Sequence, residues 1–66
     1  MRIAEFCRRS GLPRDTVRFY ERRGLLRPRV GSNRYRDFSE ADLERVRLIR
    51  IGQRLGFGLA EIKRLG

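Results

Sequence analysis

The chain contains no histidine or tryptophan and only one cysteine, Cys7. A single thiol cannot close a disulfide within the chain, and without histidine an ordinary zinc site lacks ligands. We therefore expect no metal or cofactor, and a reducing environment. Cys7 is small enough to pack where two helices approach each other, so we interpret it as a buried hydrophobic residue and not as a reactive thiol.

Long hydrophobic stretches are also missing. No apolar run approaches the ~18 residues that a membrane-spanning helix needs. The start of the chain carries Glu5 and lacks the apolar segment of a signal peptide. We expect a cytoplasmic protein that begins at its natural first residue. The sequence also offers no nucleophile–base pair and no phosphate-binding glycine loop, which argues against an enzyme.

Acidic residues are few relative to basic ones. The 17 basic residues, of which 16 are Arg, outweigh eight acidic residues and give a net charge of +9. A charge of this size on a small surface attracts polyanions. Arginine also makes planar paired contacts to phosphate and guanine that lysine does not copy. A GC-rich genome would explain arginine in place of lysine, but it would not explain the positive sign.

The chain has 66 residues, which is enough for one small domain. A domain of this length buries only about 60% of the surface that its unfolded chain exposes. The core is therefore small, with little room for a deep cleft. We treat residues 1–66 as a single domain.

Two short helices are predicted at the start of the chain. Apolar residues at helical spacing predict a helix over about 3–10, and Gly11 suits a left-handed cap at its end. A second helix is predicted over about 13–23, with Val17 and Tyr20 facing inward. Two short helices joined by a tight glycine-containing turn are the signature of a helix-turn-helix.

An irregular stretch follows over about 25–38. The turn signal at 31–33 separates two short runs, which predicts a small two-stranded hairpin. Leu25, Leu26 and Phe38 would anchor both ends of this hairpin on the core.

Residues 39–65 predict two further helices. Ser39 suits a helix N-cap, with an acidic residue three positions later in a capping-box arrangement. Two apolar rows follow on the first of these helices, which Gly56 ends: Leu43, Val46 and Ile49, then Leu48, Ile51 and Leu55. The last helix is predicted from Leu59, with three residues facing inward: Leu59, Ile62 and Leu65.

The expected fold is mainly α, a winged helix-turn-helix of about four helices with a small two-stranded wing. Its parts are a helix-turn-helix at about 3–23, a wing at about 25–38 and a helix pair at about 39–65. The second helix of such a motif lies in the major groove of DNA, where each base pair shows a distinct pattern.

Outward-facing residues of the second helix and polar residues of the wing are the candidates for DNA contact. Arg14 and Arg18 stand one helical turn apart, where both could reach guanine edges or phosphates. A basic wing suits the phosphate backbone, and Tyr35 could donate its hydroxyl there or pack on the second helix. The full candidate set is Arg14, Asp15, Thr16, Arg18, Phe19, Tyr20, Asn33, Arg34, Tyr35 and Arg36.

Four strings of the sequence together resemble the MerR family of bacterial transcription regulators. They cover most of the chain: Ile3-Ala4-Glu5-Phe6, Thr16-Val17-Arg18-Phe19-Tyr20-Glu21-Arg22-Arg23-Gly24-Leu25-Leu26, Asn33-Arg34-Tyr35-Arg36-Asp37-Phe38-Ser39-Glu40-Ala41-Asp42-Leu43, and Leu55-Gly56-Phe57-Gly58-Leu59-Ala60-Glu61-Ile62. The resemblance implies DNA contacts at Arg18, Tyr20, Arg34 and Tyr35.

The resemblance also implies a homodimer on an inverted-repeat operator. The regulator would distort promoter DNA so that RNA polymerase can use an overlong spacer. The long dimerisation helix and effector domain of the family are absent from residues 1–66, so we expect this chain to be monomeric or weakly dimeric. Pro13 and Gly58 replace residues that usually cap helices in the family, which should weaken both caps by up to about 1 kcal/mol.

Two other functions remain open from the sequence. A small architectural, excisionase-like protein that bends DNA can share this fold and size. An RNA-binding module is the other candidate, although single-stranded RNA calls for exposed aromatic residues on a sheet. Here the aromatic residues are distributed as core and wing anchors.

Overall fold

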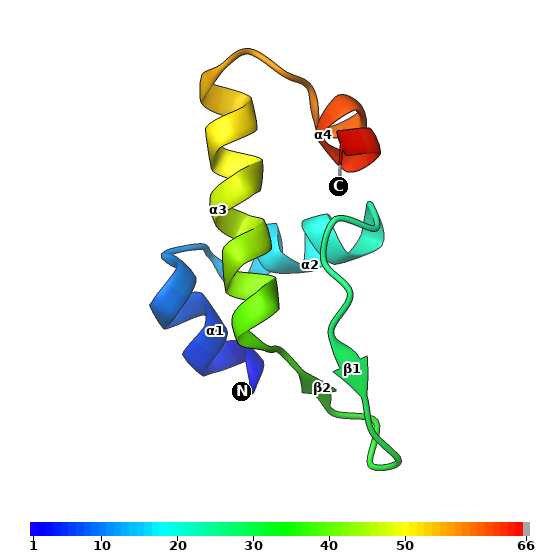
Figure 1. The fold of residues 1–66 in the computed structure, drawn as a ribbon. Helices are drawn as coiled ribbons and strands as arrows, with labels where there is room; N and C mark the ends of the chain where they lie inside the picture. Colours follow the sequence, from blue (N-terminus) through cyan, green and yellow to red (C-terminus); the bar gives the residue numbers. More distant parts are fainter. Residues whose placement is uncertain (66) are drawn as a thin grey trace.

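The computed structural model describes residues 1–65 and contains four helices and one two-stranded hairpin within that range (Figure 1). The elements, in chain order, are α1 (Ile3–Ser10), α2 (Arg14–Arg22), β1 (Arg29–Val30), β2 (Arg36–Asp37), α3 (Glu40–Arg54) and α4 (Leu59–Leu65). The expected winged helix-turn-helix is confirmed, and the helix boundaries agree with the expected ones to within one residue. No helix in this range has both the length and the apolar character that a membrane-spanning segment requires.

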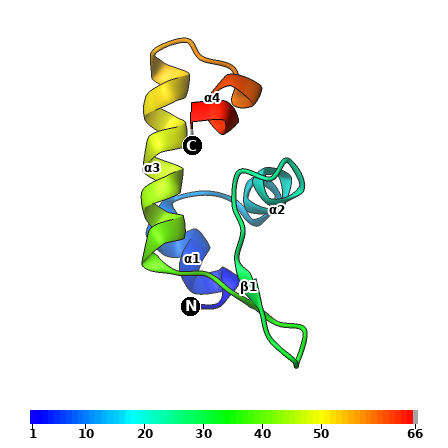
Figure 2. The same ribbon diagram turned by 45° about the vertical axis from the view of Figure 1, so that its right-hand side comes forward.

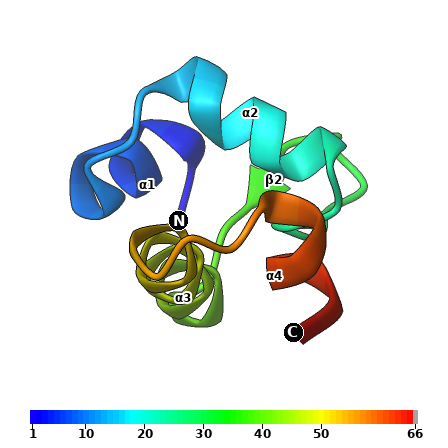
Figure 3. The same cartoon turned by 90° about the horizontal axis from the view of Figure 1, so that it is seen from above.

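The turn between α1 and α2 has the predicted left-handed cap. Gly11 has φ of 76°, and its backbone N–H donates to the carbonyl oxygen of Cys7. Pro13 then precedes α2 with φ of −64°, a value that its ring imposes and that suits a helix start. Pro13 supplies no side-chain cap, as the sequence predicts. α1 packs against both α2 and α3, which places α2 along one side of the molecule and α3 with α4 along the other (Figure 3).

The wing is a short antiparallel hairpin that projects from one end of the molecule, away from α4 (Figures 1 and 2). Arg29 pairs with Asp37, and Val30 pairs with Arg36. The side-chain oxygen of Asn33 accepts a hydrogen bond from the backbone N–H of Tyr35 at 3.2 Å, as an Asx turn does.

The core joins all parts of the fold, and the predicted wing anchors belong to it. Leu25, Leu26 and Phe38 are each no more than 2% exposed. Phe38 stacks on Phe6 of α1, with 4.4 Å between the ring centroids. The remaining buried hydrophobic residues are Leu12, Val17, Tyr20, Leu43, Val46, Ile49 and Ile62.

Both ends of the α3–α4 pair are fixed by local chemistry. The Ser39 hydroxyl accepts from the Asp42 backbone N–H while the Asp42 carboxylate accepts from Ser39, so the predicted capping box is confirmed. The backbone N–H of Gly58 donates to the Glu61 carboxylate at 3.0 Å, which supplies half of such a box where no capping side chain exists. Gly52 of α3 is buried, and a Cβ at this position would lie 2.8 Å from the Ile62 side chain, so glycine permits the close approach of α4.

Two expectations about burial need correction, those for Leu65 and Cys7. Leu65 is 74% exposed and does not face inward. α4 is only seven residues long and contacts α3 through Ile62, so its last turn extends past the core. The second apolar row of α3 also faces solvent, with Leu48 and Leu55 exposed by 62% and 72%. Cys7 is half-buried at the edge of the core and is not fully enclosed.

Candidate nucleic-acid interface

The outer face of α2 carries exposed, positively charged residues. Val17 and Tyr20 are 0% and 6% exposed and point into the core, which turns Arg14 and Arg18 outward on one helical face. Asp15 is exposed in the first turn, where a carboxylate complements the helix dipole. The structure therefore presents two guanidinium groups, one turn apart, on the helix predicted to read DNA.

The remaining α2 candidates are less accessible. Thr16 is half-buried, and Tyr20 belongs to the core. Phe19 is 37% exposed, and the guanidinium of Arg23 lies 5.7 Å from the centroid of its ring. DNA contact by these three candidates stays a prediction, and the burial of Tyr20 gives it a second role in positioning α2.

The four wing candidates are all exposed. Asn33 shapes the turn through its side-chain oxygen, and Arg34 has a left-handed backbone with φ of 64°. Tyr35 is 62% exposed, so its ring is available to a partner. The Nε of Arg36 donates to the Glu21 carboxylate of α2, which ties the wing to that helix.

Arg2 also belongs to this surface, although sequence reasoning missed it. Its guanidinium carbon lies 4.2 Å from the centroid of the Tyr35 ring, in a cation–π contact. An open hollow of about 590 Å³ lies between the start of α1, α2 and the wing, and its lining residues are Arg2, Ile3, Ala4, Arg18, Arg34, Tyr35 and Arg36. Only the tertiary fold brings Arg2 to the wing, so no local sequence pattern could have shown this contact.

The amino group of Met1 fastens strand β2 to the start of α1. It donates to the Asp37 carboxylate at 2.7 Å and to the Phe38 carbonyl at 2.6 Å. The backbone N–H of Phe38 donates back to the Met1 carbonyl at 2.7 Å. The hydrogen bond from this amine, then its positive charge, and also nearby Arg2 and Arg29, hold the pKa of Asp37 below its ordinary value.

Ion pairs within residues 1–65 engage only some of the exposed basic residues, on both sides of the molecule. Arg9 of α1 pairs with Glu5 and Glu40, and the hydrogen bond to Glu40 raises the pKa of Arg9. On α3, Arg47 pairs with Glu44. Within residues 1–65, no ion pair engages three arginines of the α2–wing side: Arg2, Arg18 and Arg34. Their charge remains available to an anion.

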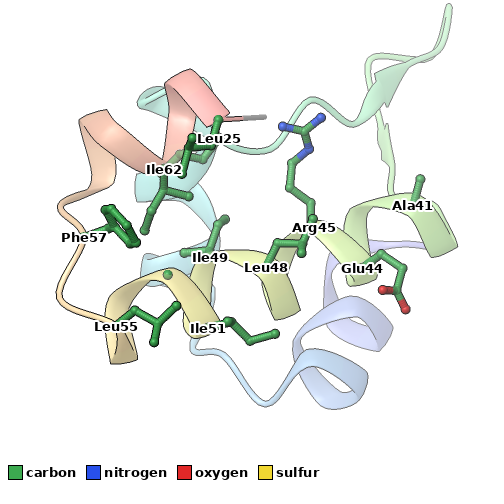
Figure 4. Close-up of a pocket in the computed structure, with 12 residues that line it drawn as sticks. Leu25, Ala41, Glu44, Arg45, Leu48, Ile49, Ile51, Leu55, Phe57 and Ile62 are labelled. Atoms are coloured by element: carbon green, nitrogen blue, oxygen red, sulfur yellow. The ribbon is translucent and has the colours of Figure 1, made fainter.

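A second hollow, of about 510 Å³, lies between α3 and α4 and is mostly apolar, although Glu44 and Arg45 also line it. The exposed row of α3 lines it together with Phe57 and Leu65 (Figure 4). Ile49 and Ile62 lie at its base, where α4 meets α3. Contiguous exposed apolar surface of this kind is typical of contacts with other proteins.

Similar proteins are found by sequence over almost the whole chain. A model of the MerR HTH family of regulatory proteins matches residues 1–65. The HTH-type transcriptional regulator HmrR of Rhizobium leguminosarum bv. viciae is 43% identical over 65 residues, which are 98% of this chain and 50% of that protein. The mercuric resistance operon regulatory protein of Shigella flexneri is 44% identical over 64 residues, 96% of this chain and 44% of the relative.

A solved structure is similar in both fold and sequence. It is the crystal structure of the transcription regulator PbrR691 from Ralstonia metallidurans CH34 in complex with lead(II), with a TM-score of 0.86 and 38% identity. The match covers 98% of this chain and 51% of that one. The chain thus spans about half the length of the proteins that it matches.

Proposed function

We propose, because this chain belongs to the MerR family of helix-turn-helix regulatory proteins, that it binds an operator in double-stranded DNA. Helix α2 would enter the major groove, and the wing would follow the neighbouring phosphate backbone. The observation that carries this proposal is the set of exposed arginines on α2 and the wing that no carboxylate within residues 1–65 pairs with.

The proposed interface has two kinds of contact, base contacts from α2 and phosphate contacts from the wing. Arg14 and Arg18 project from the helix that faces the bases, and a guanidinium donates two parallel hydrogen bonds to the O6 and N7 of guanine. Arg34 and Tyr35 project from the wing, where phosphate contacts set the register of the protein on DNA but read no sequence. Specificity would therefore depend mainly on α2, and salt-sensitive affinity on both elements.

We further propose that the complete regulator is a homodimer on an inverted repeat and that it distorts promoter DNA for RNA polymerase. The mostly apolar hollow between α3 and α4 supports an association with protein at that side. Residues 1–66 alone, without the long dimerisation helix of the family, would be monomeric or weakly dimeric. Distortion would add specificity at base pairs that the protein does not touch.

The test is selection of duplexes from a random-sequence pool, followed by titration of the selected duplex and a scrambled one at matched salt. We expect an inverted repeat to emerge and to bind at least tenfold more tightly than the scrambled duplex. Affinity should also fall steeply with salt, since neutralised phosphates release counterions. Equal affinity for both duplexes with strong bending would support an architectural protein, and preference for RNA would contradict the proposal.

A further inference from the structure

We infer that Arg2 completes a phosphate-binding hollow with Arg18 and Arg34, so that the start of α1 takes part in DNA binding. This inference rests on the proposed function and adds a third element to the interface. A backbone phosphate of the duplex is the ligand class that the hollow would take.

The first support is the convergence of charge from three separate elements. Arg2 precedes α1, Arg18 comes from the middle of α2, and Arg34 lies at the tip of the wing, yet all three line one hollow. Like charges placed together without a counter-ion repel each other, so such a cluster is favourable only when an anion joins it. Guanidinium groups bind phosphate oxygens through strong, charge-assisted hydrogen bonds.

The second support is the way in which Arg2 is held. Its guanidinium lies over the face of the Tyr35 ring, which fixes the direction of a long and otherwise flexible side chain. Both residues are exposed, so this contact orders a charge at the surface and adds nothing to the core. An arginine that is ordered before binding loses less conformational entropy when it meets a phosphate.

The third support is the absence of competing carboxylates at the hollow. No acidic residue lines it in the part of the chain that the structure describes. Glu21 is engaged by Arg36, and Asp37, whose pKa Arg2 helps to lower, is held by the amino group of Met1. Both of these carboxylates therefore already have a cationic partner other than Arg2.

The test compares Arg2→Gln with Arg8→Gln in the whole chain. Arg8 is also exposed on α1, but it lies outside the hollow and outside the ion pairs found in residues 1–65, so its replacement removes the same charge without the contact. Affinity for the selected duplex is measured over a range of salt concentrations. Loss of one phosphate contact should reduce the slope of log K against log salt by about 0.9, which corresponds to about eightfold weaker binding at 0.1 M salt.

The expected result is this loss for Arg2→Gln and less than a twofold change for Arg8→Gln. Ethylation interference gives an independent readout, because one phosphate should lose its effect only in Arg2→Gln. Arg2→Lys should restore the salt slope, since a cation is retained, and circular dichroism checks that each variant is folded. Equal slopes for the two glutamine variants overturn the inference while leaving the proposed function intact. Absence of duplex binding by the unmodified chain overturns both.

Discussion

The α2–wing side and the α3–α4 side of this small domain both carry exposed arginines, but they differ in the hollows that they form: arginines line the first and mainly apolar residues line the second. The first side carries arginines that no carboxylate pairs with in residues 1–65, arranged around a hollow. The second carries a row of exposed leucine and isoleucine on α3, beside a shorter helix. Helix α3 is apolar on two faces, one of which packs against the core while the other stays open.

This difference indicates that the two surfaces suit different partners. A basic surface recruits an anion by long-range attraction, which salt weakens. An apolar surface favours association through burial, which salt does not weaken in the same way. On the proposed function, the first surface would bind nucleic acid and the second would bind protein, and a single core supports both.

The largest expected effect comes from disrupting the hydrophobic core beneath both surfaces. Phe38→Ala deletes a ring that is 1% exposed and stacked on Phe6, which should destabilise the fold by about 3–5 kcal/mol. Both surfaces would be lost together, as thermal unfolding followed by circular dichroism would show. Leu48→Ala is the control, because Leu48 is 62% exposed and should change stability by no more than about 0.5 kcal/mol. Similar melting temperatures for the two variants would contradict the assignment of the core.

The next effect is confined to the basic surface. Arg18→Ala should weaken binding to the selected duplex by about 1–3 kcal/mol, because a paired contact to a base or phosphate is lost. The fold should survive, since Arg18 is exposed on α2. Fluorescence anisotropy measures the affinity, with Arg8→Ala as the matched control. An unfolded spectrum for Arg18→Ala would instead identify a structural residue.

A smaller effect is expected on the apolar surface. Replacing both Ile51 and Leu55 with Gln should change stability by about 0.5 kcal/mol or less at each site, because both are more than half exposed. Any weak dimer that the unmodified chain forms should be lost, as sedimentation would show. Affinity for a duplex with a single half-site should stay within twofold. A loss of half-site binding as large as that of Arg18→Ala would show that the two surfaces are not independent.

Structural features that depend on residues adjacent in the sequence could be predicted. Features that depend on how two helices pack against each other could not. The Gly11 turn and the Ser39 capping box follow from local backbone and side-chain chemistry. The outward direction of Arg14 and Arg18 follows from helical periodicity. The solvent exposure of Leu65 depends instead on where a short α4 crosses α3, which periodicity does not report.

The same distinction applies within the candidate interface. The exposed wing residues were predicted because a polar turn between short strands leaves few other positions for them. The contact of Arg2 with Tyr35 joins residues far apart in the sequence. The tie between Arg36 and Glu21 is equally non-local. The cation–π contact and the ion pair both depend on the angle between the wing and the helices, which the packing of the core determines.

The smallest expected effect tests how firmly the wing is fastened, through the ion pair between the Met1 amine and Asp37. The pKa of Asp37 is lower in the folded chain than its ordinary value of 3.8, so the carboxylate stabilises the fold above that pH. This contribution is lost as the pH falls through the lowered pKa, because protonation removes the charge that the amine attracts.

Asp37→Asn should therefore lower the melting temperature slightly at about pH 6, and the difference from the unmodified chain should vanish well below pH 3.8. Thermal melts at both pH values measure it. Duplex binding at about pH 6 should change less than in Arg18→Ala, since the substitution removes a negative charge beside the basic surface while loosening the wing. A difference in melting temperature that persists unchanged at low pH would show that Asp37 acts through packing and not through its charge.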